Sequence, residues 1–283
     1  MSGKNRVNAA ALARFVIQII FFIFLPALFS SAFNGIKYIV NQISGGEMIG
    51  WTPFVEILAV LLFFTFLFGR FFCGYACAFG SLGDWLFSLS AFAQKKTIGK
   101  VLKFPEKAIR ILSYAKYLVL AFVVIFCFAG VYAKAAVLDP WEVFGIFRSG
   151  YFNIEGRIPM TIVFVLILCG MLLIERFFCM FLCPMGAVFA LLPMLPFTTF
   201  NRKKEDCIKG CSICEKACPA NISLGEDARS TSECFQCGKC AAKCPKGNIR
   251  LGIRKLAGTE IRLAIVKAAA LFAVCYFRPF GDF

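Results

Sequence analysis

The sequence contains no histidine, and this absence limits the redox and metal chemistry open to the chain. Histidine provides both axial ligands of bis-imidazole haem and is a common ligand of zinc, copper and non-haem iron. Bis-imidazole haem and histidine-ligated zinc, copper and non-haem iron are therefore excluded within this chain, and we expect no haem. Any redox chemistry must use the 15 cysteines, most of which fall in tight groups that suit metal ligation better than a disulfide framework.

Acidic residues are also scarce, because 16 Asp and Glu stand against 31 Lys and Arg, which gives a formal net charge of +15. An excess of this size is found in nucleic-acid-binding proteins and in membrane proteins. Here the basic residues alternate with apolar runs instead of forming one patch, which argues against nucleic acid as a partner. We interpret them as the flanks of membrane spans, where they contact anionic lipid.

Apolar residues make up 60% of the chain, and its mean hydropathy is +0.77. This composition is too apolar for a soluble fold, so most of the chain is expected in lipid. Four runs are long enough, or nearly so, to cross a bilayer. They are predicted at Leu12–Phe33, Pro53–Phe72, Ile111–Tyr132 and Ile158–Phe178. The first run is longer than the core of a secretory signal, so we interpret it as a retained span.

The distribution of positive charge predicts the orientation of these spans. The connection between the second and third spans, residues 73–110, carries a group of lysines and an arginine in its second half. The first loop, Asn34–Thr52, has only Lys37 and Glu47 as charged residues. Because positive loops remain in the cytoplasm, we expect an integral protein of the cytoplasmic (inner) membrane with both termini on the cytoplasmic side.

The composition changes abruptly after Pro196, where the chain becomes polar, basic and rich in cysteine. We predict a membrane domain at residues 1–200, a cytoplasmic ferredoxin-like domain at 201–256 and a tail at 257–283. The tail has a short apolar centre between basic residues, which favours a helix along the membrane surface, with a fifth crossing as the alternative. The predicted fold class is an all-α integral membrane protein of four transmembrane helices with a two-helix internal repeat. A small α+β ferredoxin-like domain for two clusters is appended to it.

The predicted cytoplasmic domain contains two cysteine runs that each end in Cys-Pro. Cys234-x2-Cys237-x2-Cys240-x3-Cys244-Pro245 is the cluster-binding run of bacterial ferredoxins, in which the fourth cysteine binds the neighbouring cluster. The upstream run departs slightly, with three residues instead of two between its first two cysteines. Applied to both runs, this crossing rule predicts two [4Fe-4S] clusters. The first cysteine set is Cys207, Cys211, Cys214 and Cys244; the second cysteine set is Cys218, Cys234, Cys237 and Cys240.

Zinc is the alternative occupant of these cysteines, because closely spaced cysteines also form zinc knuckles. Two complete four-cysteine runs, each with its terminal Cys-Pro pair, favour iron–sulfur clusters instead.

A further cysteine pattern recurs at the ends of the second and fourth apolar runs. Residues 70–80 read RFFCGYACAFG and residues 176–186 read RFFCMFLCPMG; we call them the first and second RFFC copies. Residues i and i+4 share one face of a helix, so each cysteine pair is predicted to project from one side. The alternative is that these cysteines only pack as small apolar side chains, but the recurrence of the surrounding sequence favours a metal. The predicted ligands of a four-sulfur iron or iron–sulfur centre at the membrane boundary are Cys73, Cys77, Cys179 and Cys183.

The second copy, Cys179-x3-Cys183-Pro184, resembles the C-x3-C-P motif of membrane-bound polyferredoxin proteins. These include the NapH-type quinol dehydrogenase ferredoxin subunit of periplasmic nitrate reductase systems and the related cores of NosR and CcoG proteins. Four spans, cytoplasmic termini, two such pairs and two C-terminal ferredoxin motifs resemble the NapH-type layout over nearly the whole chain. The first copy departs from the motif, because Ala78 follows Cys77 where the family usually has proline.

The resemblance implies quinol oxidation by an electron-transfer subunit of an oxidoreductase complex, coupled to a periplasmic reductase. Its expected partners are quinone or quinol, other redox subunits and membrane lipid. We assign no catalytic residue, although Asp139 or Glu142 beside Trp141 could accept a proton from a quinol. An interfacial aromatic belt is the alternative role of that loop.

Two other functions are compatible with the same residues. The clusters could donate electrons during assembly or maturation of another metalloenzyme, or they could act as a membrane redox sensor. A sensor would be expected to carry a DNA-binding or signalling segment, and the sequence shows none.

Overall fold

The computed structural model describes residues 3–102, 104–132, 143–145, 158–193, 195, 198–203, 205–222, 232–252, 254–256 and 259–277. The described chain is mainly helical, as predicted, with one small antiparallel sheet. It divides into two compact units, each assembled from separate stretches of sequence. The first unit contains residues 1–29, 59–81 and 186–283, and the second contains residues 30–58 and 82–185. This division does not test the predicted domain boundaries, which remain predictions.

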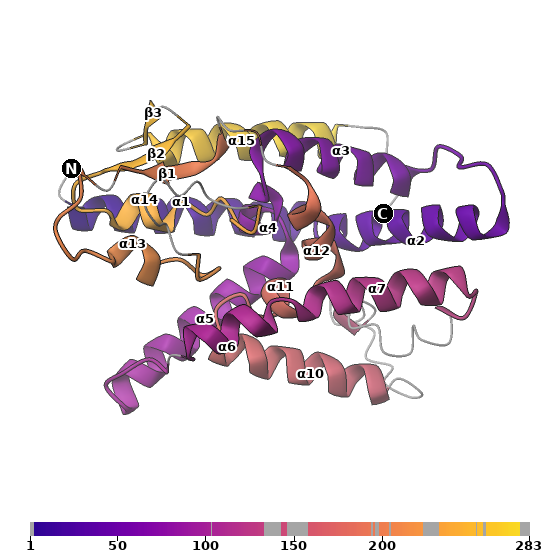
Figure 1. Cartoon of the computed structure of the whole chain (residues 1–283), viewed down its shortest axis with the longest axis horizontal. Coiled ribbons are helices and arrows are strands. Elements are labelled where there is room, and N and C mark those ends of the chain that lie inside the picture. Colours follow the sequence, from indigo (N-terminus) through magenta and orange to yellow (C-terminus); the bar gives the residue numbers. More distant parts are fainter. Residues whose placement is uncertain are drawn as a thin grey trace. The chain divides into compact units, whose positions relative to one another are not determined.

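The first unit combines long apolar helices with the short elements of residues 200–256, which we call the cysteine-rich segment (Figure 1). Its helices are α1 (Gly3–Phe24), the second half of α3 (Pro53–Phe68), α4 (Phe71–Tyr75), most of α12 (Pro184–Leu191), α13 (Ile213–Lys216), α14 (Lys239–Lys243) and α15 (Glu260–Tyr276). Its strands are β1 (Phe200–Arg202), β2 (Ile249–Leu251) and β3 (Arg254–Lys255), which pair antiparallel in the order β1-β2-β3.

Among its described residues, the second unit contains helices and the loops that connect them, and no strand. It contains most of α2 (Leu28–Gly45), the first half of α3, most of α5 (Ala78–Thr97), α6 (Glu106–Leu112), α7 (Ala115–Phe128), α10 (Ile158–Leu173) and α11 (Phe177–Phe181). Helices α3 and α10 are apolar on all sides, which is typical of helices in an apolar surrounding.

Among the described residues, two stretches are helical, long and apolar enough to cross a membrane. These are Asn5–Phe24 in α1 and Lys107–Phe128 in α6 and α7, and only 22% and 11% of their residues are buried. Core helices of soluble proteins are mostly buried, so the large exposed apolar surface suggests association with a membrane. The other two predicted spans correspond to shorter apolar helices, Pro53–Phe68 and Ile158–Leu173.

The first predicted span, Leu12–Phe33, is wrong in its boundaries. Helix α1 ends at Phe24 and α2 begins at Leu28, so the predicted run joins parts of two helices. Pro26 lies between them, and it lacks a backbone N–H and disfavours helical backbone at the preceding residue. The predicted loop Asn34–Thr52 is also wrong in part, because α2 continues to Gly45.

Helix α15 lies alongside α1 in the first unit (Figure 1). The ring of Phe272 meets the rings of Phe21 and Phe24 edge-on, with centroids 5.6 and 6.1 Å apart. Arg6 near the start of α1 forms a 2.7 Å ion pair with Glu260 at the start of α15. These contacts fix the predicted tail against α1 within the unit, while its position at a membrane surface remains a prediction.

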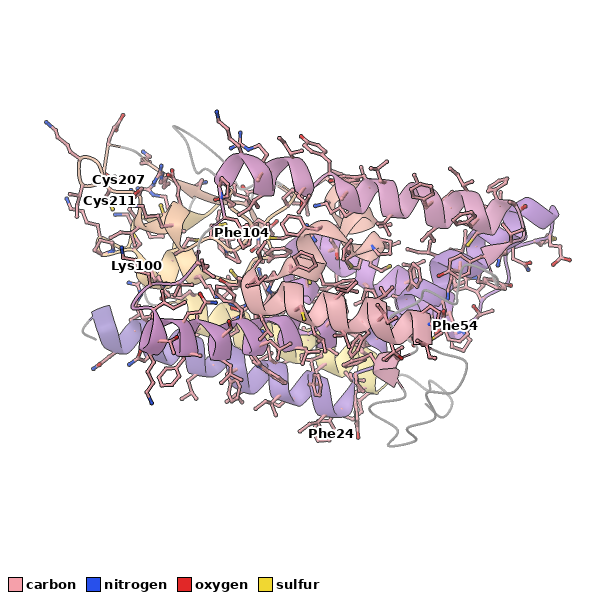
Figure 2. All side chains as sticks on the ribbon, turned by 90° about the horizontal axis from the view of Figure 1, so that it is seen from below. Phe24, Phe54, Lys100, Phe104, Cys207 and Cys211 are labelled. Atoms are coloured by element: carbon pink, nitrogen blue, oxygen red, sulfur yellow. The ribbon has the colours of Figure 1, made fainter. Side chains whose placement is uncertain are left out.

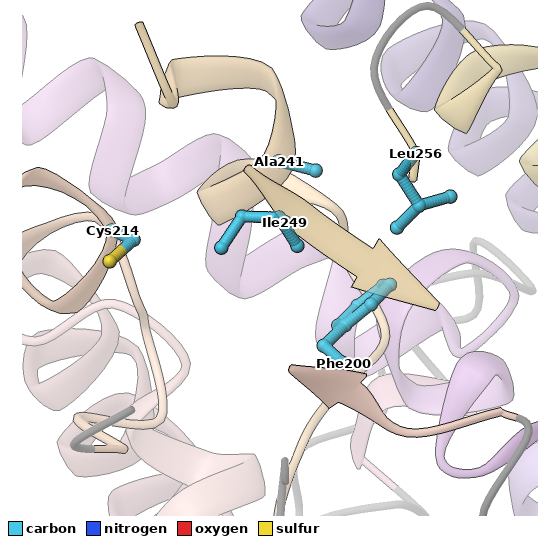
Figure 3. Packing of buried hydrophobic residues seen from close by; sticks show 5 residues of the cluster. All are labelled: Phe200, Cys214, Ala241, Ile249 and Leu256. Carbon is cyan, nitrogen blue, oxygen red and sulfur yellow. The ribbon is translucent and has the colours of Figure 1, made fainter. Parts of the chain in front are cut away.

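The cysteine-rich segment has a small apolar core of its own. Figure 3 shows the five buried residues of this core, and they are Phe200, Cys214, Ala241, Ile249 and Leu256. Cys214 of the upstream run belongs to this core, and Cys234, Cys240 and Cys244 of the downstream run pack against it, so the core positions candidate ligands. The loop residues Asp139, Trp141 and Glu142 lie outside the described residues.

Candidate iron–sulfur sites

The first cysteine set surrounds one pocket. All four members, Cys207, Cys211, Cys214 and Cys244, line it together with Arg202, Ile213, Pro245, Asn248 and Ile249. Figure 2 labels Cys207 and Cys211, which lie beside each other. Cys214 belongs to α13, whereas Cys244 directly follows α14 and comes from the other run. The structure therefore brings together the residues that the crossing rule groups, although it does not test whether they bind a cluster.

Polar side chains in this pocket point their donors at the cysteine sulfurs. The Nη1 of Arg202 donates to the Sγ of Cys214 at 3.0 Å. Asn248 donates from Nδ2 to the Sγ of Cys207 at 3.2 Å and from its backbone N–H to the Sγ of Cys244 at 3.3 Å. Hydrogen bonds and positive charge at ligand sulfurs favour the thiolate form and raise the potential of a bound cluster.

The second cysteine set is a crowded group of thiols. Burial is the main reason that the pKa of Cys240 lies well above its ordinary value, and the charges of Cys237, Cys234 and Cys218 raise it further. These four residues therefore lie within electrostatic reach of one another, although Cys218 comes from the upstream run. Two left-handed residues, Gln236 (φ 53°) and Gly238 (φ 69°), shape the loop that carries Cys237.

The zinc alternative places a strict demand on the positions of the cysteines. A tetrahedral zinc ion needs four sulfurs about 2.3 Å from one point. Among the described residues, no three His, Cys, Asp or Glu side chains are placed to hold one metal ion. A [4Fe-4S] cluster at each cysteine set remains a prediction.

The two RFFC copies adopt nearly the same local structure. In each copy a five-residue helix, α4 or α11, contains the first cysteine, and the second cysteine directly precedes the next helix. The backbone N–H groups of Cys77 and Cys183 donate to the carbonyl oxygens of Phe72 and Phe178, both at 2.9 Å. The internal repeat is therefore present in backbone structure as well as in sequence.

The prediction that each cysteine pair shares a face of one continuous helix is wrong. Helix α3 ends at Phe68 before Gly69, whose φ of 67° breaks it, and Cys77 lies outside α4. In the second copy Arg176 takes a φ of 60°, and Pro184 starts the helix after Cys183. Proline at the first helical position disfavours helical backbone at the preceding residue, so the second cysteine falls in a break.

All four cysteines of the RFFC copies are buried. Cys73 and Cys77 belong to the first unit, and Cys179 and Cys183 belong to the second. A single centre with all four as ligands therefore remains a prediction.

Each RFFC copy also begins with a buried arginine that is paired with a carboxylate. Arg70 donates to Glu233 at 2.8 Å in the first unit. In the second unit Arg176 binds Asp84 through two hydrogen bonds, from Nε at 2.9 Å and from Nη2 at 2.5 Å. These pairs neutralise charges that would otherwise be costly to bury.

A buried lysine provides positive charge near the second cysteine set. Lys267 of α15 lies over the rings of Phe68 and Phe71, 5.1 and 5.7 Å from their centroids. Burial lowers its pKa to about 8, and the negative charge of Cys234 opposes this shift. Because 8 is above neutral pH, the side chain remains mainly protonated at pH 7.

Replacing Lys267 with methionine is expected to lower the reduction potential of the cluster at the second cysteine set by tens of millivolts. A buried cation stabilises the reduced cluster, and a unit charge at roughly 10 Å in an effective dielectric of about 20 contributes ~1.7 kcal/mol. A redox titration followed by EPR measures the shift. The control is Lys243→Met, which removes an exposed charge beside Cys244 that water screens. An equal shift in both variants, or a rise in potential, would contradict the assignment.

Sequence reasoning did not find the residues that surround the cysteines. Arg202, Asn248, Glu233 and Lys267 come from different elements and have no recognisable spacing relative to the cysteines they approach. A weak signal did exist for Glu233, because it directly precedes Cys234 and is the nearest acid to the second run.

Comparisons with known proteins agree with an iron–sulfur protein. Residues 51–97 and 157–201 match the family model of a 4Fe-4S binding domain. These two segments are the ones that contain the RFFC copies. The family match therefore covers both repeated cysteine pairs, whose binding of a metal remains a prediction.

The chain is distantly related to three kinds of protein. It is 28% identical over 247 residues to an uncharacterized protein of Methanocaldococcus jannaschii, which covers 86% of this chain and 87% of that protein. It is 29% identical over 210 residues to YccM of Escherichia coli, which its name describes as a candidate electron transport protein. The aligned region covers 69% of this chain and 56% of YccM. It is 21% identical over 222 residues to the regulatory protein NosR of Pseudomonas aeruginosa. The aligned region covers 70% of this chain and 29% of NosR. No solved structure matches the chain. The expected relationship to NosR is confirmed at this distance.

Proposed function

We propose that this chain is a membrane-bound iron–sulfur protein that transfers electrons between the quinone pool and a redox partner, as a quinol dehydrogenase component of the NapH type. The observation that carries the proposal is the grouping of the cysteines. The first set lines one pocket, and in the second set Cys218, Cys234 and Cys237 lie within electrostatic reach of Cys240. A [4Fe-4S] cluster at each set would carry one electron at a time, as a relay requires.

A location in the cytoplasmic membrane is supported by the two exposed apolar stretches of membrane length. Quinones dissolve in the lipid, so a relay that ends in a polar cluster domain suits electron transfer out of the membrane. The similarity to YccM, a protein named for electron transport, supports the same class of function. The cysteine-rich segment and both termini are proposed to lie on the cytoplasmic side, where lysine and arginine collect.

A third iron–sulfur centre is proposed at the RFFC copies. Its support is the match of both copies to a 4Fe-4S binding domain, together with their shared backbone structure. The candidate ligands are Cys73, Cys77, Cys179 and Cys183. In the sequence, each RFFC copy follows an apolar helix, α3 or α10, and both copies precede the cysteine-rich segment.

The function is tested by adding a quinol to the anaerobically purified, detergent-solubilised protein and recording EPR spectra. We expect a menaquinol or ubiquinol analogue to reduce at least one cluster, because the relay must accept electrons from the lipid phase. The matched variant is Cys73→Ser/Cys179→Ser. It is expected to lose iron beyond the two clusters of the cysteine-rich segment and to lose reduction by quinol, while dithionite still reduces those two clusters.

The contrary outcomes are distinct. If no quinol reduces any cluster in a protein with its full iron content, the quinol-linked role is wrong. If the double variant keeps all its iron, the RFFC cysteines pack and hold no metal.

A redox sensor is the second candidate function, because the relative NosR is named as a regulatory protein. A sensor needs its clusters to respond to oxidant or iron status, without turnover by quinol. Reduction by quinol at rates that match a respiratory reductase would favour the electron carrier.

A further inference from the structure

The loop between Cys234 and Cys237 packs directly against the first RFFC copy, and both belong to the first unit. The carbonyl oxygen of Phe235 lies so close to Gly74 that a Cβ added at this glycine would collide with it. The hydroxyl of Tyr75 donates to the carbonyl oxygen of Cys237 at 3.2 Å. Gly74 and Tyr75 directly follow Cys73, so this contact joins a cysteine of the RFFC copy to two cysteines of the second set.

Arg70 holds the other side of the same contact. It pairs with Glu233 at 2.8 Å, and its guanidinium lies over the ring of Phe235, 4.7 Å from the centroid. Both Arg70 and Phe235 are buried. The loop is also tied down by Gln236, whose Nε2 donates to the carbonyl oxygen of Thr198 at 2.9 Å. The segment from Glu233 to Cys237 is thus held on both sides and in its middle.

The second RFFC copy lacks the residues that make this contact. Met180 and Phe181 stand where the first copy has Gly74 and Tyr75. Methionine has the side chain that Gly74 must lack for the close approach of a backbone carbonyl. Phenylalanine has no hydroxyl to donate to a carbonyl. Only the first copy therefore has the residues to accept this loop.

We propose that the contact of Gly74 and Tyr75 with the Phe235 loop is the junction through which electrons enter the cysteine-rich segment, so that the cluster at the second cysteine set receives them before the cluster at the first set. This inference rests on the proposed function. Electron tunnelling weakens steeply with separation, and the junction gives a short path from Cys73 through Tyr75 and its hydrogen bond to the carbonyl oxygen of Cys237. Gly74 and Tyr75 act here as positioning residues.

The proposed transfer is balanced in electrons. A centre held with Cys73 and Cys77 among its ligands would supply one electron, and a cluster held by the second cysteine set would accept it, passing from its 2+ to its 1+ state without movement of a proton. A quinol supplies two such electrons in succession and releases two protons to water as it becomes quinone. A redox protein then removes the electrons from the cluster of the first set.

The junction itself is tested by hydrogen exchange on the intact, cluster-loaded protein. Gly74→Ala is expected to speed exchange in residues 232–238 by about tenfold or more, because overpacking of this kind usually costs that much. The control is Gly83→Ala, another buried glycine, whose added Cβ would meet only the side chain of Met171 at 3.5 Å or more. Tyr75→Phe, which gives the first copy the residue of the second, is expected to have a smaller effect in the same segment.

The order of the clusters is tested by removing one at a time. Cys218→Ala is expected to abolish fast quinol reduction of the remaining first-set cluster, whereas Cys244→Ala is expected to leave quinol reduction of the second-set cluster intact. Equal reduction of the surviving cluster in both variants would overturn the inference. Unchanged exchange in Gly74→Ala would also overturn it, whatever the quinol does. If exchange changes as expected but wild-type protein is not reduced by quinol, the junction stands as a contact and the proposed function fails.

Discussion

Replacing Cys244 with alanine is expected to remove the cluster of the upstream run and to leave the cluster of its own run in place. Cys244 lines the pocket of Cys207, Cys211 and Cys214, and its sulfur accepts a hydrogen bond from the backbone of Asn248. The protein should lose about four of its iron atoms, since a [4Fe-4S] cluster needs four cysteine ligands. Iron and sulfide analysis with EPR of the dithionite-reduced protein measures the loss.

The reciprocal variant and a marker show which cluster has been lost. Cys218→Ala should remove the cluster of Cys234, Cys237 and Cys240 and spare the other. The potential shift caused by Lys267→Met marks the second-set cluster, so this shift should survive in the Cys244→Ala background. It should disappear in the Cys218→Ala background. The opposite pattern would show that each run binds its own cluster and that the crossing rule fails here.

The grouping of these cysteines could be predicted from the sequence because cluster ligands follow a local rule. Three cysteines two residues apart can reach one cluster only in a compact loop, and a following Cys-Pro directs the fourth ligand elsewhere. This geometry depends little on the rest of the fold, so the longer spacing between Cys207 and Cys211 did not prevent their placement at one pocket. The ligation itself remains a prediction.

The junction could not be predicted, because it depends on contacts between segments about 160 residues apart in sequence. A glycine and a tyrosine after Cys73 are compatible with many structures until the Phe235 loop is seen to lie on them. The difference between Gly-Tyr-Ala at 74–76 in the first copy and Met-Phe-Leu at 180–182 in the second was visible in the sequence. Its meaning was not, because a repeat is normally interpreted through what its copies share.

The boundaries of the apolar helices were the least predictable part of the fold. Hydropathy continues through Pro26 and through the RFFC copies, so it cannot show where the helices end. The breaks follow from backbone chemistry at single positions, namely proline at 26 and 184 and left-handed backbone at Gly69 and Arg176. A hydropathy average over a window of about 19 residues does not detect such positions.

Replacing Asp84 with alanine is expected to lower the free energy of unfolding by about 3–5 kcal/mol, because it removes a carboxylate that binds a buried guanidinium through two hydrogen bonds. Asp84 and Arg176 are both buried, they share two hydrogen bonds, and Arg176 is further constrained by its left-handed backbone. Denaturant unfolding of the detergent-solubilised protein measures the change. A matched control is Asp206→Ala, which breaks the more exposed pair with Arg250 and should cost about 1 kcal/mol or less.

The double variant Asp84→Leu/Arg176→Met separates the cost of the unpaired charge from the value of the pair. Replacing a buried ion pair by apolar residues of similar volume is often neutral or stabilising, so most of the lost stability should return. The iron content should decrease wherever the free energy of unfolding decreases. The reason is that Arg176 directly precedes α11, which carries Cys179. If Asp84→Ala is no more destabilising than Asp206→Ala, Arg176 has another counter-charge. If the double variant is as unstable as Asp84→Ala, the two hydrogen bonds matter for the structure of the second RFFC copy beyond neutralising its arginine.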